Sequence, residues 1–191
     1  MRKHLIKLAE HGRSISPECK FFETKFIDLS YRWLNIINPS YGSRIIDLGI
    51  GFGYLSHICK TERYCDVHGI DEPNRDPAFS IMNQILEVPV TEHKIEKFQE
   101  IPFEGKYDII IATLICFARD GLCSDNPVPW NIDAHKFFLR NCMYHLRRDG
   151  KMFFKFNEPM TEEAKDLYAS KGDTISDKTY LINNSGPYLH A

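Results

Sequence analysis

Three glycines at alternate positions form the stretch of this sequence that is best suited to chemistry. Gly49, Gly51 and Gly53 stand where a β-branched run at 44–49 meets a helix-like stretch at 53–61. An ordinary turn between a strand and a helix needs only one glycine. Three glycines indicate a backbone that adopts unusual dihedral angles and lies close to a ligand.

The spacing of these glycines distinguishes among the common nucleotide-binding loops. The dinucleotide motif GxGxxG would require a third glycine at the position of Tyr54. A phosphate-binding loop of the GxxxxGK[ST] kind would require a lysine, and none occurs between Gly49 and Leu55. The observed GxGxG spacing therefore disfavours both an NAD-dependent dehydrogenase and a P-loop protein.

The segment DLGIGFGYL, from Asp47 to Leu55, resembles the first motif of the class I S-adenosylmethionine-dependent methyltransferases. In that family this loop passes under the methionine half of the cofactor. The resemblance covers residues 40–157 and implies S-adenosylmethionine as the cofactor. Asp47 suits the positive charges of this ligand, and the N-terminus of the following helix can face its carboxylate.

A second acid strengthens this resemblance. Asp71 ends the strand expected at 65–71 and lies 24 residues after Asp47. An acid at about this distance from the glycine loop can accept both hydrogen bonds of a ribose diol. The resemblance gives Asp71 that role. The cofactor site that it implies consists of Asp47, Gly49, Gly51, Gly53, Tyr54, Asp71, Glu72, Ile95, Glu96 and Thr113.

The residues expected beside the adenine ring depart from the family pattern. The family often has an acid followed by a hydrophobic residue after the third strand, but Lys94 takes the place of the acid. Either Glu96 substitutes for that acid, or backbone groups around Ile95 read the adenine.

Catalytic residues are harder to identify, because the protein mainly aligns a methyl group that the sulfonium has already activated. The segment 118–134 is expected to form a lid over the acceptor. His135, at the start of the next helix, is the candidate general base, and the alternative is a histidine that faces water. Tyr31 and Trp33 of the N-terminal helices are expected to complete the pocket.

The acceptor is expected to be a small molecule, methylated at oxygen. Relatives that methylate amide or adenine nitrogens carry an Asn/Asp-Pro-Pro-aromatic motif after the fourth strand, where this chain has ATLI at 112–115. RNA ribose methyltransferases are a less favoured alternative: Lys155 and Glu158 match parts of their Lys-Asp-Lys-Glu set, but the aspartate is missing. Lys155 either points into the site or reaches solvent.

A non-catalytic S-adenosylmethionine-binding or assembly module is the other alternative.

Strands and helices alternate along the chain and must position these motifs. Apolar periodicity predicts helices at 19–38, 53–61, 78–88, 132–150 and 160–173. Strands are predicted at 44–49, 65–71, 88–95, 106–117, 151–156 and 178–184. Gly150 is expected to end the fourth of these helices and Thr161 to cap the fifth. The alternation predicts an α/β fold with a doubly wound, mainly parallel sheet of six to seven strands and helices on both faces.

The organisation expected is a single domain over 1–191. It consists of an N-terminal helical cap at 1–40, a cofactor-binding core at 41–160, and a C-terminal helix with a closing strand at 161–191. Whether a seventh strand is present stays open. The sheet edge or the N-terminal helices could pair two copies in a homodimer.

Composition and charge limit the expected partners, location and metal sites of the protein. A formal net charge of -2 and a pI of about 6.4 make nucleic acid an unlikely partner. No apolar run approaches the roughly 20 residues of a membrane span, and the cytoplasm is the expected location. The six cysteines include no CxxC pair, and most of them are expected to be free thiols. His57, Cys59, Cys65 and His68 have zinc-ligand types, but Cys65 and His68 would face opposite sides of a strand, so no metal is expected.

Overall fold

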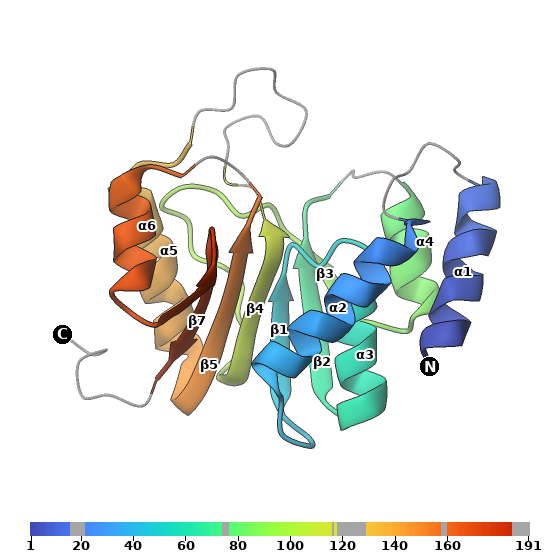
Figure 1. The fold of residues 1–191 in the computed structure, drawn as a ribbon. Helices are drawn as coiled ribbons and strands as arrows, with labels where there is room; N and C mark the ends of the chain where they lie inside the picture. The colour runs from blue at the N-terminus through green and yellow to red at the C-terminus, as the bar shows by residue number, and fades with distance from the viewer. Residues whose placement is uncertain (16–21, 74–76, 116, 118–128, 158–159, 185–191) are drawn as a thin grey trace.

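A seven-stranded sheet crosses the molecule in the order β3-β2-β1-β4-β5-β7-β6 (Figure 1). The computed structural model describes residues 1–15, 22–73, 77–115, 117, 129–157 and 160–184. The strands are β1 (Arg44–Leu48), β2 (Asp66–Asp71), β3 (Val90–Glu92), β4 (Tyr107–Ile115), β5 (Leu146–Phe156), β6 (Asp173–Ser176) and β7 (Thr179–Asn183). The helices are α1 (Arg2–Ile15), α2 (Thr24–Ile37), α3 (Tyr54–Arg63), α4 (Pro77–Ile85), α5 (Ile132–His145) and α6 (Glu162–Ala169).

Five of the strands are parallel, which confirms the predicted α/β class. β1 pairs in parallel with β2 and β4, β2 with β3, and β4 with β5, whereas β7 runs antiparallel to both β5 and β6. The carboxyl ends of β1 to β5 therefore lie along one edge of the sheet. The strand order reverses between β1 and β4, which is the point where open α/β sheets bind ligands.

Alternate residues of β4 belong to two different hydrophobic cores, one on each face of the sheet. Ile109 and Ile111 pack with residues of α1 to α4, whereas Ile110 and Ala112 pack with residues of α5 and α6. In Figure 1, α2, α3 and α4 accordingly lie on one side of the sheet and α5 and α6 on the other, with α1 outermost. A strand that is buried on both faces reads as a continuous apolar run, which is why the sequence predicts β4 so clearly.

The predicted end of α5 at Gly150 is wrong. The helix ends at His145, and the following residues already belong to β5. Arg147 there forms hydrogen bonds of 2.9 and 3.0 Å with the Asp108 carboxylate of β4. A Cβ on Gly150 would lie 2.9 Å from the Asp108 carbonyl oxygen, so this glycine allows two strands to approach closely.

The C-terminal part of the sheet is more complete than the sequence indicates. α6 begins after Thr161, whose side chain accepts a hydrogen bond from the Ala164 amide, as predicted, but it ends at Ala169. β6 follows and pairs with β7, so the strand whose presence was open exists. All four residues of β6 are exposed, and a strand without a buried face gives no alternating signal.

Candidate cofactor site

The glycine loop connects β1 to α3 through three left-handed residues. The φ angles of Gly49, Gly51 and Gly53 are +68°, +58° and +72°. Residues with a Cβ pay a steric penalty in this region, and glycine does not. The backbone conformation therefore accounts for the three glycines, and Gly53 forms the N-cap of α3.

Hydrogen bonds fasten the loop to the end of β2. The Gly51 amide donates to Asp71 Oδ2 at 2.8 Å, and the Glu72 amide donates to Asp71 Oδ1 at the same distance. The amides of Gly49 and Ile50 both donate to the Ile70 carbonyl, at 2.7 and 3.2 Å. Asp71 is only 8% exposed, so the fold fixes its carboxylate against the loop.

Asn83 of α4 holds the other side of the loop, and the sequence analysis does not identify it. Its Nδ2 donates to the Gly51 carbonyl at 2.8 Å, and a Cβ on Gly53 would clash with its Oδ1. Asn83 is 6% exposed, and Oδ1 has no hydrogen-bond partner among the described residues. The sequence offered one sign of its importance: Asn83 is a polar residue close to the apolar Met82 and Leu86, which are buried, in a helix without charged residues.

Asp47 lies beneath the loop as a buried carboxyl group with one unused oxygen. Its Oδ2 accepts a 2.7 Å hydrogen bond from Ser56 of α3, whereas Oδ1 lacks a partner in the described part of the chain. Burial, with a smaller contribution from the charge of Asp71, raises the pKa of Asp47 to about 7, although the Ser56 hydrogen bond opposes this shift. A cationic group beside Oδ1 would stabilise the ionised carboxylate.

Aromatic side chains back the loop. Phe52 contacts Phe22 and Phe79 with ring centroids 4.7 Å apart in each case, and contacts Tyr54 at 5.9 Å. Tyr54, the first residue of α3, is 4% exposed. A buried aromatic ring therefore stands at the position where the dinucleotide motif has glycine.

Lys94 brings together two acids of the predicted cofactor site, Glu72 and Glu96. Its ammonium lies 3.9 Å from the Glu72 carboxylate and 3.4 Å from that of Glu96, and all three side chains are about half exposed. Ile95 packs on the core of α5 and α6. Thr113 lies on β4, in register with Lys155 of β5.

His135 lies in the first turn of α5 but does not face water. It is 1% exposed, and its Nδ1 lies 3.2 Å from the Tyr168 hydroxyl. The rings of Phe117, Trp130 and Phe156 surround it, with centroids 5.7 to 6.1 Å away. Burial, assisted by the charge of Lys97, lowers the pKa of His135 to about 4. The histidine is therefore neutral and enclosed in this conformation.

Other expected acceptor-site residues are engaged by the fold. Tyr31 donates to Glu62 at 2.9 Å and Trp33 packs on Phe153, and their part in an acceptor pocket stays a prediction. Lys155 donates to the Asp177 carbonyl at 2.8 Å, in the β6–β7 turn. Residues 118–128 of the expected lid, and Glu158, lie outside the described residues.

The zinc-ligand residue types do not converge. His57 contacts the Leu86 carbonyl and His68 the Thr91 hydroxyl, each at 2.8 Å. Within the described ranges, no group of three or more His, Cys, Asp or Glu residues could hold a metal ion. Cys59, Cys65 and Cys142 are free and buried.

In the described part of the chain, no helix is both long enough and apolar enough to cross a membrane.

Comparison with known proteins identifies the fold. No family model and no curated protein matches the chain. A methyltransferase structure from Pyrococcus furiosus matches with a TM-score of 0.57 and 12% identity, over 96% of this chain and 98% of that one. A chain from the complex of the Haloferax volcanii Trm112 methyltransferase activator with a proposed methyltransferase matches with a TM-score of 0.50 and 16% identity, over 78% of this chain and 58% of that one. The chain therefore has the fold of the class I S-adenosylmethionine-dependent methyltransferases.

Proposed function

We propose that this protein binds S-adenosylmethionine and transfers its methyl group to an oxygen of a small-molecule acceptor. The observation that carries the proposal is the glycine loop at the sheet's switch point, held between Asp71 and Asn83 with Asp47 beneath it. A loop of three left-handed glycines presents backbone to a ligand without side chains in the way.

The residues present fit this cofactor. It carries an ammonium, and Asp47 has a buried carboxyl oxygen without a partner among the described residues, which such a cation would satisfy. Asp71 would accept hydrogen bonds from the ribose hydroxyls in an orientation that Gly51 and Glu72 already fix. The N-terminus of α3 would face the ligand carboxylate.

The adenine contacts follow from the same arrangement. Glu72 and Glu96 both pair with Lys94 beyond the carboxyl ends of β2 and β3, and we assign the adenine contacts to these two acids and to Ile95, with Thr113 on the side of β4. When bound, S-adenosylmethionine supplies a methyl group already activated for displacement. The chain's own task is then to orient the acceptor and to exclude water.

A general base is the least supported part of the proposal. His135 stays a prediction in that role: it lies at the correct edge of the sheet, but its enclosure supports a packing role instead. This observation favours one alternative, a cofactor-binding module without catalytic activity. The assignments to the cytoplasm, to a small-molecule partner, to a single domain over 1–191 and to a homodimer also stay predictions.

Calorimetric titration with S-adenosylmethionine, S-adenosylhomocysteine and NAD tests the cofactor assignment. We expect the two sulfur nucleosides to bind and NAD not to bind. Binding of NAD alone, or of none of the three, would overturn the proposal.

A second experiment separates an enzyme from a binding module. Incubation with methyl-labelled S-adenosylmethionine and panels of phenols, aliphatic alcohols, amines and RNA should transfer label to a hydroxylated small molecule. Label on an amine or on RNA would correct the acceptor class. Binding without transfer to any panel would favour the module.

A further inference from the structure

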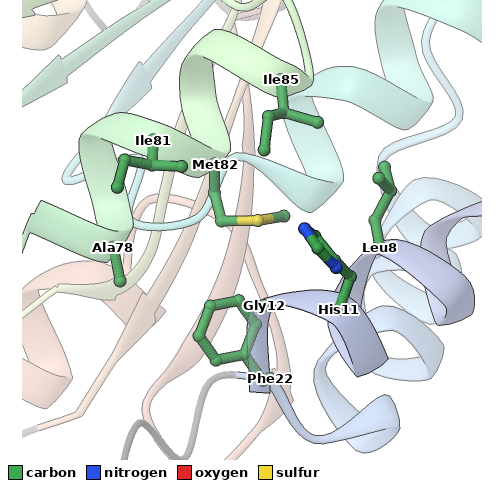
Figure 2. A pocket seen from close by; sticks show the side chains of 8 residues that line it. All are labelled: Leu8, His11, Gly12, Phe22, Ala78, Ile81, Met82 and Ile85. Carbon is green, nitrogen blue, oxygen red and sulfur yellow. The ribbon is translucent and has the colours of Figure 1, made fainter. Parts of the chain in front are cut away.

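An apolar groove lies between α1 and α4 (Figure 2). Leu8, His11 and Gly12 contribute one side, and residues of α4 contribute the other. The residues that line the groove are Leu8, His11, Gly12, Phe22, Ala78, Ile81, Met82 and Ile85. Figure 2 shows the Met82 side chain extending across the groove toward the His11 ring.

The α4 side of this groove exposes aliphatic surface that the fold itself does not cover. Ile81 is 43% exposed and Ile85 is 44% exposed, one helical turn apart on the same side of α4. No charged residue occurs in α4. Together with the apolar hollow, these two isoleucines form one contiguous apolar surface.

The α1 side is basic, in contrast to the rest of the protein. α1 contains Arg2, Lys3, Lys7 and Arg13 against the single acid Glu10, a net charge of +3, in a chain whose net charge is -2. Arg2 pairs with Asp28, and Arg13 donates to the Phe22 carbonyl.

The exposed lysines of α1 border the groove. Lys7 is exposed and lies one turn before His11, which lines the groove, and Lys3 is one turn further. The groove thus combines an apolar floor, an aliphatic wall and a basic rim.

We propose that this groove binds an acidic amphipathic helix of a partner protein. Apolar side chains one turn apart on such a helix would pack between Leu8, Met82 and the two isoleucines. Its acidic residues would face Lys3 and Lys7. The methionine in the floor has a flexible side chain that adapts to different apolar partners.

The same observations disfavour two other occupants. In a symmetric pair of copies the basic rims would face each other, and like charges oppose that association. A lipid bilayer is a flat partner, whereas the apolar surface here is a hollow between two helices with Met82 in its floor.

Fluorescence anisotropy with three labelled synthetic peptides tests the proposal. The first peptide is an amphipathic helix of leucine and glutamate, the second has the same composition in an order without an apolar face, and the third replaces glutamate by lysine. We expect only the first to bind. Binding by none, or equal binding of the first two, would overturn the proposal.

Matched variants show whether binding occurs in the groove. Ile81→Gln should weaken the first peptide about tenfold, and Lys7→Glu should weaken it about threefold. The controls make the same changes elsewhere: Ile175→Gln on β6, where Ile175 is 41% exposed, and Arg140→Glu on α5. Equal losses in variants and controls would contradict the assigned site.

Two further measurements address the other occupants. Sedimentation with vesicles of phosphatidylserine and phosphatidylcholine should show no binding that depends on Ile81. Analytical ultracentrifugation should show no dimer that Ile81→Gln dissociates. Either positive result would overturn the proposal in favour of a membrane or of a second copy.

Discussion

The amide of Gly51 donates a 2.8 Å hydrogen bond to the carboxylate of Asp71, so the residue proposed to hold the ribose also sets the shape of the glycine loop. The two residues come from the ends of adjacent parallel strands, β1 and β2. A change at Asp71 therefore acts on the ligand directly and through the loop.

Asp71→Asn should weaken S-adenosylhomocysteine binding by at least about tenfold, because both oxygens of the native carboxylate accept from backbone amides. The asparagine side chain must direct its own donor toward one of them. A hydrogen bond to a charged acceptor contributes about 1.5–3 kcal/mol, so the melting temperature should fall as well. Calorimetry and thermal denaturation measure the two effects.

Asp66→Asn is the matched control, since Asp66 begins the same strand at the opposite edge and is exposed. This variant makes the same change in charge. Equal affinity of wild type and Asp71→Asn for the ligand would contradict the ribose assignment.

Asn83→Leu tests whether this side chain positions the loop for the ligand. The substitution keeps a similar volume, removes the donor to the Gly51 carbonyl, and also removes a buried oxygen that lacks a partner among the described residues. The two effects on stability oppose each other, so the melting temperature should change little while ligand affinity falls about tenfold. Gln84→Leu, at an exposed amide on the same helix, is the control. A large loss of stability without a loss of affinity would indicate a structural role alone.

The sequence predicts those parts of the fold whose pattern of apolar residues matches their burial in the structure. β4 is buried on both faces, so its uninterrupted apolar run is a sufficient signal. β6 forms a hairpin with β7, but all four of its residues are exposed, so no alternation of apolar and polar residues marks it in the sequence. α5 ends where β5 begins, and the partners of β5 on β4 lie 39 positions earlier in the sequence, as the Arg147–Asp108 hydrogen bond shows.

The candidate site divides in the same way. Gly49, Gly51 and Gly53 are visible in the sequence because left-handed backbone angles favour glycine. Asn83 is invisible, because its importance depends on how α4 packs against the loop. In the sequence His135 resembles a surface histidine at the start of a helix. The aromatic residues that bury it come from distant positions: Phe117 after β4, Phe156 of β5 and Tyr168 of α6.

Asp47 should make the protein less stable as pH rises. Its pKa is about 7 in the folded state and 3.8 for the unperturbed group, so the folded protein retains a proton that the unfolded chain loses. The free energy of unfolding then falls as pH increases from about 4 to about 7 and levels off above that. Between pH 5 and pH 8 this contribution is about 3 kcal/mol, and Asp47→Asn should remove it in denaturant titrations.

The same group predicts a proton linkage of ligand binding. An ammonium beside Asp47 Oδ1 stabilises the charged form, so S-adenosylhomocysteine should release protons when it binds near pH 7. Calorimetry in buffers of different ionisation enthalpy measures the number released. Asp47→Asn should bind more weakly and release none; unchanged proton release in the variant would place the ammonium elsewhere.

His135 should contribute to the pH dependence with the opposite sign. Burial lowers its pKa to about 4 from 6.5, so the unfolded state binds the proton more readily. Stability that depends on the neutral histidine is complete above pH 6.5 and is lost as pH falls toward 4. His135→Gln should make unfolding less sensitive to acid over that window, with His11→Gln at the surface of α1 as the control.

If His135→Ala remains folded, turnover equal to wild type would exclude a role as general base.

Gly53→Ala should destabilise the protein more than Gly42→Ala, although both glycines have φ angles near +73°. No atom lies within 4 Å of a Cβ at Gly42, so that variant measures the cost of the left-handed backbone alone, about 1–2 kcal/mol. A Cβ at Gly53 also clashes with Asn83 Oδ1, which adds a steric cost. In the background of Asn83→Ala this second cost should disappear, and Gly53→Ala should then cost as much as Gly42→Ala. Denaturant titration of the four variants gives the coupling energy between Gly53 and Asn83. A coupling near zero would show that α4 does not restrict the loop at this position.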